Sequence, residues 1–209
     1  MYPNNFTLEL MYNKSITYNA KICGGGLKKI KEDKENIILI NSSCIFNKEG
    51  MIDYFDYQYD YCFFRFIYNK KFLKKNNIYF PNYLRYQDPP FFIKAMSLAK
   101  KFYALNETTY LYRKDYKNIT WNQRKVIDQF KGFNECLTLS KLYNLNNLYC
   151  KVVKHLNSNL FLEAANDFNN NFYLKSLITN ILNSINFNKL NKENCKIKLN
   201  KIYKKILNK

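Results

Sequence analysis

Residues 77–92, with the sequence NIYFPNYLRYQDPPFF, constrain the fold of this chain most, because they hold three of its four prolines. A proline has no backbone N–H and is excluded from helix interiors and central strands. The apolar residues 78–80 therefore predict a short strand that ends at Pro81, and a helix is predicted over residues 89–102. Asp88 lies between them, so one carboxylate is expected at a strand-to-helix junction, where a side chain can point into a cleft.

The composition predicts a folded globular protein, since 47% of the 209 residues are hydrophobic and 18% are aromatic. The apolar runs are short and the first residues lack a basic and then apolar pattern, so neither a transmembrane helix nor a secretory signal is expected. The six cysteines lie far apart, which predicts reduced, buried thiols in a cytosolic protein rather than a zinc site or disulfides. They are Cys23, Cys44, Cys62, Cys136, Cys150 and Cys195.

The net charge of +18 by itself indicates a nucleic-acid or membrane partner. However, the joint richness in Lys, Asn, Ile, Tyr and Phe is typical of an AT-rich coding sequence, in which Lys is the default cation. Arginine is the cation used for bidentate recognition of phosphate and carboxylate groups. The chain has four arginines, all between residues 65 and 124, which points to that region as the site of chemistry. They are Arg65, Arg85, Arg113 and Arg124.

Apolar spacing predicts several further elements. They are a helix over residues 5–18, a strand over 20–23 with a glycine turn or bulge at 24–26, a strand over 37–40, a helix over 63–73, a strand over 110–112 and helices from residue 121 onward. In the last region, Val126, Phe130, Phe133 and Leu137 recur at helical steps and predict a buried stripe.

Residues 53–61, DYFDYQYDY, alternate acids with aromatics. Asp53, Asp56 and Asp60 match no calcium-loop spacing, so a partly exposed loop is the favoured interpretation. The alternative is that the tyrosines offer flat faces on which a sugar ring stacks.

The last segment, residues 187–209, carries eight lysines and one glutamate. Cys195, Leu199, Ile202 and Ile206 form an apolar stripe, so the segment predicts a basic amphipathic helix. Such a helix can bind an anionic membrane surface or remain a solvated terminal helix, and both interpretations stay open.

Two roles fit Asp88. An aspartate directly before proline is a favoured helix N-cap, because the residue before a proline is pushed out of the α region. A carboxylate can also serve as the general base that takes a proton from an attacking hydroxyl. The roles are compatible, although the helix dipole alone would lower the basicity of the carboxylate.

Four segments of the chain, in order, resemble the second half of family-2 glycosyltransferases. FTLELMYNKSI with NAKICGGG resembles the helix and strand after that family's metal-binding aspartates. YDYCFFRFIYNKKFLKKNNIYFP resembles its acceptor-side helix and strand, RYQDPPFF occupies the place of its E-D-x-x-F motif, and TYLYRKDYKNIT that of its Y-x-Y-R strand and loop. The resemblance covers roughly residues 3–125.

The resemblance implies that Asp88 is the catalytic base and that Gln87 stands where the family more often has Glu. We further expect substrate contacts by Gln87, Tyr86, Tyr57, Tyr59 and Tyr61. The resemblance places Arg113 at the edge of the active site, near the donor phosphates. The complete enzyme would transfer a sugar from a nucleotide-sugar donor to a surface glycan at the cytoplasmic face of the membrane.

The family's nucleotide-binding half and its D-x-D motif, which holds Mg²⁺ or Mn²⁺ on the donor, have no counterpart in this chain, and no metal ligands are identified. We therefore expect a truncated product, one half of a split enzyme with a separate N-terminal half, or a fragment, inactive by itself. The expected fold is α/β: part of a Rossmann-like GT-A domain over residues 1–120, followed by a helical extension over residues 121–209.

The alternative from another functional class is a basic module without catalytic activity that binds nucleic acid or a membrane surface. Since composition explains the charge and no recognition motif is found, a nucleic-acid partner is not expected. A peripheral membrane contact through residues 187–209 is compatible with either class.

Overall fold

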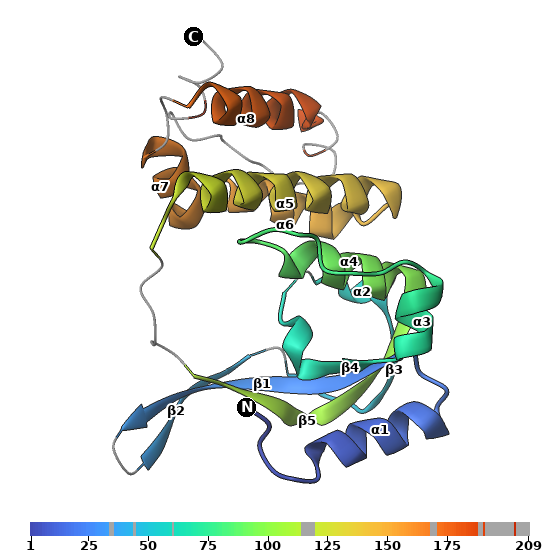
Figure 1. The fold of residues 1–209 in the computed structure, drawn as a ribbon. Helices are drawn as coiled ribbons and strands as arrows, with labels where there is room; N and C mark the ends of the chain where they lie inside the picture. The colour runs from blue at the N-terminus through green and yellow to red at the C-terminus, as the bar shows by residue number, and fades with distance from the viewer. Residues whose placement is uncertain are drawn as a thin grey trace. The chain divides into compact units, whose positions relative to one another are not determined.

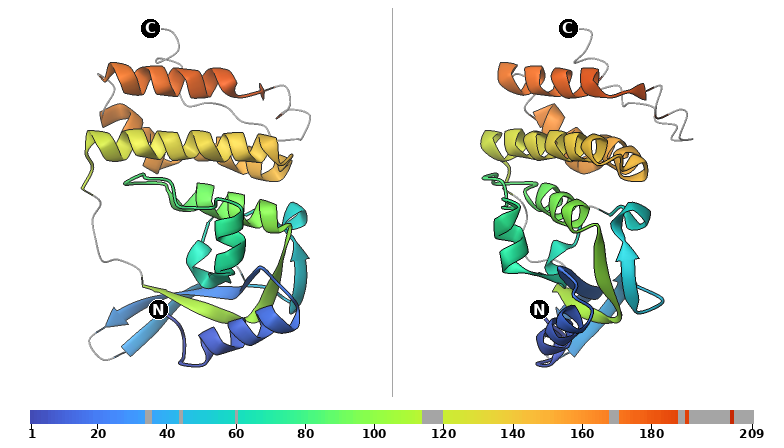
Figure 2. Two further views of the ribbon diagram at one scale, coloured as in Figure 1. Left: turned by 45° about the vertical axis from the view of Figure 1, so that its right-hand side comes forward. Right: turned by 90° about the vertical axis from the view of Figure 1, so that its right-hand side faces the viewer.

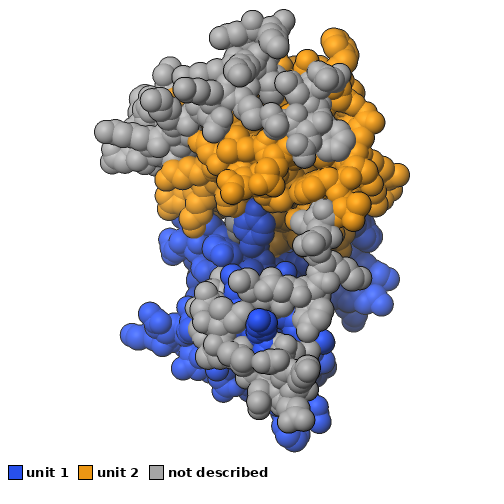
Figure 3. Space-filling model, turned by 90° about the vertical axis from the view of Figure 1, so that its left-hand side faces the viewer, with its two compact units in different colours: residues 1–79, 94–119 blue, residues 80–93, 120–209 orange. Residues whose placement is uncertain are grey.

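The computed structural model describes residues 1–33, 36–43, 45–59, 61–113, 120–167, 171–187, 190 and 203. The chain divides into two compact units (Figure 3). The sheet unit comprises residues 1–79 and 94–119, and the helical unit comprises residues 80–93 and 120–209. The predicted division at residue 120 falls next to one of these boundaries. The proline-rich segment, however, belongs to the helical unit rather than to the sheet.

The sheet unit is built on a mixed sheet with the strand order β2-β1-β5-β3 (Figure 1). β1 and β5 run parallel, and the other pairs are antiparallel, including β4 with the first residues of β1. The strands are β1 (Ile22–Asp33), β2 (Asn36–Ser43), β3 (Gly50–Asp53), β4 (Phe66–Tyr68) and β5 (Lys101–Arg113). Strands are therefore present at residues 22–23, 37–40 and 110–112, as predicted.

Four short helical segments accompany the sheet: α1 (Thr7–Thr17), α2 (Tyr54–Tyr57), the 3-10 helix η1 (Phe63–Arg65) and α3 (Lys70–Lys75). The prediction of a helix over residues 5–18 is confirmed by α1. Its inward face packs on the sheet in an apolar cluster of Met11, Ala20, Cys23, Tyr103 and Leu105. Burial raises the pKa of the Cys23 thiol to about 12, so it stays protonated.

The sequence predicts a glycine turn or bulge at residues 24–26. The turn is wrong, because β1 continues through all three glycines, but the pairing of β1 with β5 is irregular between Gly24 and Gly26 and between Gly26 and Leu27, as a bulge would be. A Cβ atom on Gly24 would overlap the Phe66 ring, and one on Gly25 would overlap the carbonyl oxygen of Glu107. The Gly25 N–H donates a 3.0 Å hydrogen bond to Thr109 Oγ1. These glycines therefore allow the neighbouring chain segments to approach the strand closely.

The prediction of one helix over residues 63–73 is also wrong. The segment forms η1, β4 and α3 in succession. Phe66 is buried where β4 pairs with β1, and the Asn69 side chain accepts a 2.9 Å hydrogen bond from the Phe72 N–H, so a new helix starts there. Residues 78–80 form no strand, although Ile78 is buried.

The helical unit contains α5 (Gln123–Leu142), α6 (Asn146–His155), α7 (Asn159–Asp167), α8 (Phe172–Ser184) and the first part of α4 (Asp88–Ala99). α5 packs against α6 and α8 (Figures 1 and 2). Asn122 and Asn171 cap α5 and α8 by accepting backbone N–H bonds of 2.9 and 2.8 Å. Val126, Phe130, Phe133 and Leu137 are all buried, which confirms the predicted stripe.

The fold is thus mixed α/β with a helical region after residue 120. No helix in the described ranges is long and apolar enough to span a membrane. Cys44, Asp60, Cys195 and the rest of the predicted tail helix lie outside the described residues, apart from residues 187, 190 and 203. Tyr203 is fully buried, and its hydroxyl donates a 2.7 Å hydrogen bond to the Leu156 carbonyl oxygen.

Candidate active site

Asp88 is the first residue of α4, followed by the buried prolines Pro89 and Pro90. Proline fits here because the first N–H groups of a helix have no partner within the helix. The sequence predicts Asp88 as the N-cap and Pro89 as the first helical residue, so helix and carboxylate lie where expected to within one residue. The carboxylate is thereby held on the first turn of a regular helix.

The Asp88 carboxyl is half-buried, and burial raises its pKa, while the positive charge of Arg85 acts in the opposite direction. The raised pKa is opposite to the change expected from the helix dipole alone. Across the described ranges, no hydrogen bond or ion pair to this carboxylate is found. A carboxylate that is desolvated and has no donor to stabilise its charge is a stronger base than one in water.

The loop before Asp88 is fastened to α5 by side chains of that helix. Asp128 is 5% exposed, and its Oδ2 accepts a 3.0 Å hydrogen bond from the Leu84 N–H. The Tyr83 hydroxyl donates a 3.2 Å bond to Glu135 Oε2. Burial and the charge of Glu135 raise the pKa of Tyr83 to about 12, so its hydroxyl stays protonated at neutral pH.

The end of this loop is held by Tyr86, which has a left-handed backbone with φ of 64°. Its carbonyl oxygen lies against the Cα of Gly132, where a Cβ would overlap it. Its ring is 7% exposed and packs edge-on against Phe161, and its hydroxyl lies 3.4 Å from His155 Nδ1. A non-glycine residue holds a left-handed conformation only when its surroundings compensate for the cost.

Two arginines lie in or next to the fastened loop, Arg85 in the loop itself and Arg124 on α5 beside Asp128. The guanidinium of Arg85 lies over the Trp121 ring at 5.7 Å from its centre. Arg124 Nε lies 3.7 Å from Asp128 Oδ2, with 64% of the Arg124 side chain exposed. Two of the four arginines therefore lie in this unit, on or beside the segment that carries Asp88.

A pocket of about 450 Å³ opens beside the same loop, within the helical unit. Its lining includes the loop residues Asn82 and Tyr83, the α5 residues Gln123, Arg124 and Lys131, and Tyr173 of α8. A volume of this order suits a small molecule of the size of one or two sugar rings.

The predicted site residues fall into two groups. Tyr86, Gln87 and Asp88 are consecutive in the helical unit, where Tyr86 is buried and has little surface to offer a substrate. Arg113, at the exposed end of β5, and Tyr59 and Tyr61, which are partly exposed, belong to the sheet unit. The Tyr59 carbonyl oxygen accepts a hydrogen bond from the Tyr54 hydroxyl, and its ring lies 5.7 Å from that of Tyr57.

The described part of the chain contains no set of side chains that could bind the metal that the resemblance implies. No three His, Cys, Asp or Glu side chains converge there on a point that could bind a cation. Asp53, one of the acids considered in the sequence, instead caps α2 by accepting the Phe55 N–H at 2.9 Å. We therefore assign no chemical step of this chain to a metal ion.

Asp128, Glu135 and Tyr173 were not predicted from the sequence as residues of the site. In α5, the polar residues Asp128 and Gln129 stand among the apolar residues of the buried stripe, and this pattern could have marked them. The two residues are 5% and 0% exposed. A polar side chain at such a position generally has a specific partner. Tyr173 gave no signal in the sequence.

Comparison of the chain with models of known protein families, with curated proteins and with solved structures found no match.

Proposed function

We propose that this chain provides the acceptor-binding part of a family-2-like glycosyltransferase, with Asp88 as the general base. The single observation that carries the proposal is the Asp88 carboxyl: it is half-buried at the start of α4 and its pKa is raised by burial. The order of the four resembling segments, given above, supports it. The mixed α/β fold with a helical region after residue 120 is compatible with part of a GT-A domain.

In the proposed reaction, the Asp88 carboxylate accepts the proton of an acceptor hydroxyl while that oxygen attacks the anomeric carbon of the donor sugar. The bond from that carbon to the nucleotide diphosphate breaks at the same time, and the new glycosidic bond has inverted configuration. General-base catalysis of this kind contributes about 10²–10⁴ in rate. The fastened loop would keep the carboxylate in place during the reaction.

The remaining parts of the proposal concern the complete enzyme. Its substrates would be a nucleotide-sugar and a glycan acceptor, and it would act at the cytoplasmic face of the membrane. A segment with the D-x-D motif, on a separate chain or encoded next to this one, would bind the donor and a divalent metal. Arg113, Tyr59 and Tyr61 are proposed as substrate contacts, and Gln87 as a neighbour of the base.

The test is a sugar-transfer assay with the chain alone and with the chain joined to any D-x-D-containing segment encoded beside it. Asp88→Asn is expected to lower the turnover rate about 10²–10⁴-fold. Asp56→Asn, an exposed acid of α2, serves as the matched control and is expected to leave the rate unchanged. An Asp88→Asn variant as active as the parent protein would exclude Asp88 as the base.

A second candidate function, binding to an anionic membrane surface, is favoured by an observation on α1. Leu8, Tyr12 and Ile16 recur every four residues on its outer face and are 45%, 60% and 64% exposed. Tyr12 and Ile16 line a hollow of about 360 Å³ together with Lys21, Lys70 and Lys71. Exposed apolar side chains with lysines around them match an anionic lipid surface.

Co-sedimentation with vesicles tests this candidate. The double variant Tyr12→Ser and Ile16→Ser is expected to lose binding to vesicles that contain anionic lipid. Phe172→Ser is the matched control, because Phe172 is 86% exposed in the helical unit. Equal binding by the double variant and the parent would refute the assignment to α1.

A further inference from the structure

The pocket beside the Asp88 loop combines cationic and aromatic groups in a way that indicates the chemistry of its ligand. Two cations, Arg124 and Lys131, line it from α5. Among the lining residues that the structure describes, the one carboxylate is that of Asp128, which already accepts the Leu84 N–H and lies next to Arg124. Because the Tyr83 hydroxyl stays neutral, the lining carries a net positive charge.

The position of the pocket on α5 adds to this positive potential. Gln123 and Arg124 are the first two residues of this 20-residue helix, so its N-terminal backbone N–H groups lie at the same end as the pocket. The positive end of the helix dipole favours an anion here. The exposed guanidinium of Arg124 can donate two parallel hydrogen bonds to a carboxylate or phosphate.

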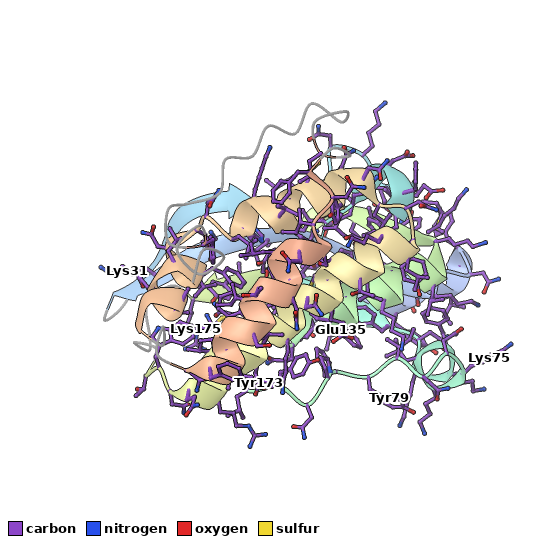
Figure 4. All side chains as sticks on the ribbon, turned by 90° about the horizontal axis from the view of Figure 1, so that it is seen from above. Lys31, Lys75, Tyr79, Glu135, Tyr173 and Lys175 are labelled. Carbon is purple, nitrogen blue, oxygen red and sulfur yellow. The ribbon has the colours of Figure 1, made fainter. Side chains whose placement is uncertain are left out.

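The aromatic wall comes from Tyr173, in the first turn of α8 (Figure 4). Its side chain is 53% exposed, and the Lys131 ammonium lies 5.8 Å from the centre of its ring. A flat, exposed tyrosine ring is a surface on which the C–H face of a sugar can stack. Asn82 and Gln123, both exposed, add amide groups that can bind sugar hydroxyls.

The loop before Asp88 also lines the pocket. Asn82 and Tyr83 belong to the loop that is fastened to α5 by Tyr83 and Leu84. The same loop leads into Asp88. A ligand in this pocket is therefore held by the polypeptide segment that also positions the proposed base.

We propose that this pocket binds a sugar that carries a negative charge, either a uronate carboxylate or a phosphate ester. Arg124 and Lys131 would bind the charged group, and the sugar ring would stack on Tyr173. That this sugar is a unit of the glycan acceptor rests on the proposed function, whereas the binding itself does not depend on it.

The test measures binding of four probes to the 209-residue chain by protein-detected NMR or calorimetry: glucuronate, glucose 6-phosphate, glucose and inorganic phosphate. At least one of the two charged sugars is expected to bind with a dissociation constant of about 1 mM, the range for a ligand of this size. Glucose and inorganic phosphate are expected to bind at least about fivefold more weakly, since each lacks one of the two recognised groups. The comparison of the two charged sugars identifies the anionic group.

Arg124→Gln and Tyr173→Ala are each expected to weaken binding of the preferred sugar at least about fivefold. Lys154→Gln, an exposed lysine of α6 outside the pocket, removes the same charge as a control and is expected to have no effect. Circular dichroism verifies that each variant is folded.

Three results would overturn the proposal: charged sugars that bind no better than glucose, inorganic phosphate that binds as tightly as both charged sugars, or unchanged binding in both pocket variants. Asp88→Asn separates this inference from the proposed function, because it is expected to abolish transfer and to leave sugar binding unchanged. If Asp88→Asn loses transfer but no charged sugar binds the chain, only the role of Asp88 as the base is supported. If a charged sugar binds but no transfer is seen, only the pocket is supported.

Discussion

Two aspartates of the helical unit, one in the first turn of α4 and one in the second turn of α5, have opposite environments. Asp128, in α5, is buried, accepts the Leu84 N–H and lies beside Arg124. Asp88, at the start of α4, is half-buried, and the pKa of its carboxyl is raised by burial. A carboxylate that is hydrogen-bonded stabilises the structure around it, whereas one that is desolvated without such bonds keeps its basicity.

The two regions are connected through residues 80–87. The Phe80 ring stacks on that of Phe91 at 3.9 Å, Leu84 is bound to Asp128, and the Tyr86 backbone lies against Gly132. Asp128 thus holds the segment that leads to Asp88, the proposed base. Substitutions in each region are therefore expected to affect different properties.

The largest loss of stability is expected for Gly132→Ala. The added Cβ would overlap the Tyr86 carbonyl oxygen, which belongs to the backbone and cannot rotate away. The expected cost is about 3 kcal/mol, at the upper end for overpacking. Urea unfolding measures it, and Asn134→Ala, on the same helix, is the control with a cost within about 0.5 kcal/mol. Equal costs for both variants would show that the loop is not held at Gly132.

Asp128→Ala is expected to cost about 2 kcal/mol, because it leaves the Leu84 N–H without its partner. Asp128→Asn keeps an acceptor oxygen and is expected to cost less. Hydrogen exchange of the Leu84 amide provides a local measurement, and the exchange rate should rise in the Ala variant. An unchanged rate would mean that Asp128 does not hold the loop.

His155, the single histidine of the chain, is expected to make the helical unit sensitive to acid. Burial lowers the pKa of its imidazole in the folded state below the ordinary 6.5, so the unfolded chain binds the proton more tightly. Stability should therefore decrease as the pH falls from about 6.5 towards the lowered pKa. The loss of stability over this pH range is expected to be below about 1 kcal/mol, and it should be smaller in His155→Gln. A pH series of urea midpoints that is identical in both proteins would contradict the expectation.

The smallest change in stability is expected for Asp88→Asn. Unlike Gly132→Ala and Asp128→Ala, it is expected to stabilise the protein. The folded state raises the pKa of this carboxyl, so the ionised form disfavours folding above that pKa, and this penalty disappears as the pH falls towards 3.8. The Asn variant should be slightly more stable than the parent at neutral pH, within about 0.5 kcal/mol, because the group is partly solvated. Urea midpoints at pH 7 and pH 4 measure the difference. A variant that is less stable at pH 7 would indicate that Asp88 serves mainly as a helix cap.

The buried stripe of α5 and the start of α4 were predicted best. The spacing of Val126, Phe130, Phe133 and Leu137 is a property of consecutive turns, and all four are buried. The prolines correctly indicated where α4 begins, because their restriction on the backbone is local. The position of Asp88 followed from these local rules.

The errors concern residues whose conformation depends on distant partners. Gly25 bonds to Thr109, 84 positions away, and Phe66 is buried on β1, so neither the continuous β1 nor the short β4 follows from neighbouring residues. The partner of Asp128, the loop residue Leu84, is 44 positions away.

The sequence by itself determined the α1 helix, the buried stripe of α5 and the place of one carboxylate at the beginning of α4, because these depend on periodicity, caps and prolines within a few residues. Only the tertiary structure decided how basic that carboxylate is, which aspartate stabilises the loop and where a pocket opens. Those properties depend on desolvation and on contacts between segments far apart in the chain, and they arise only when the chain has packed.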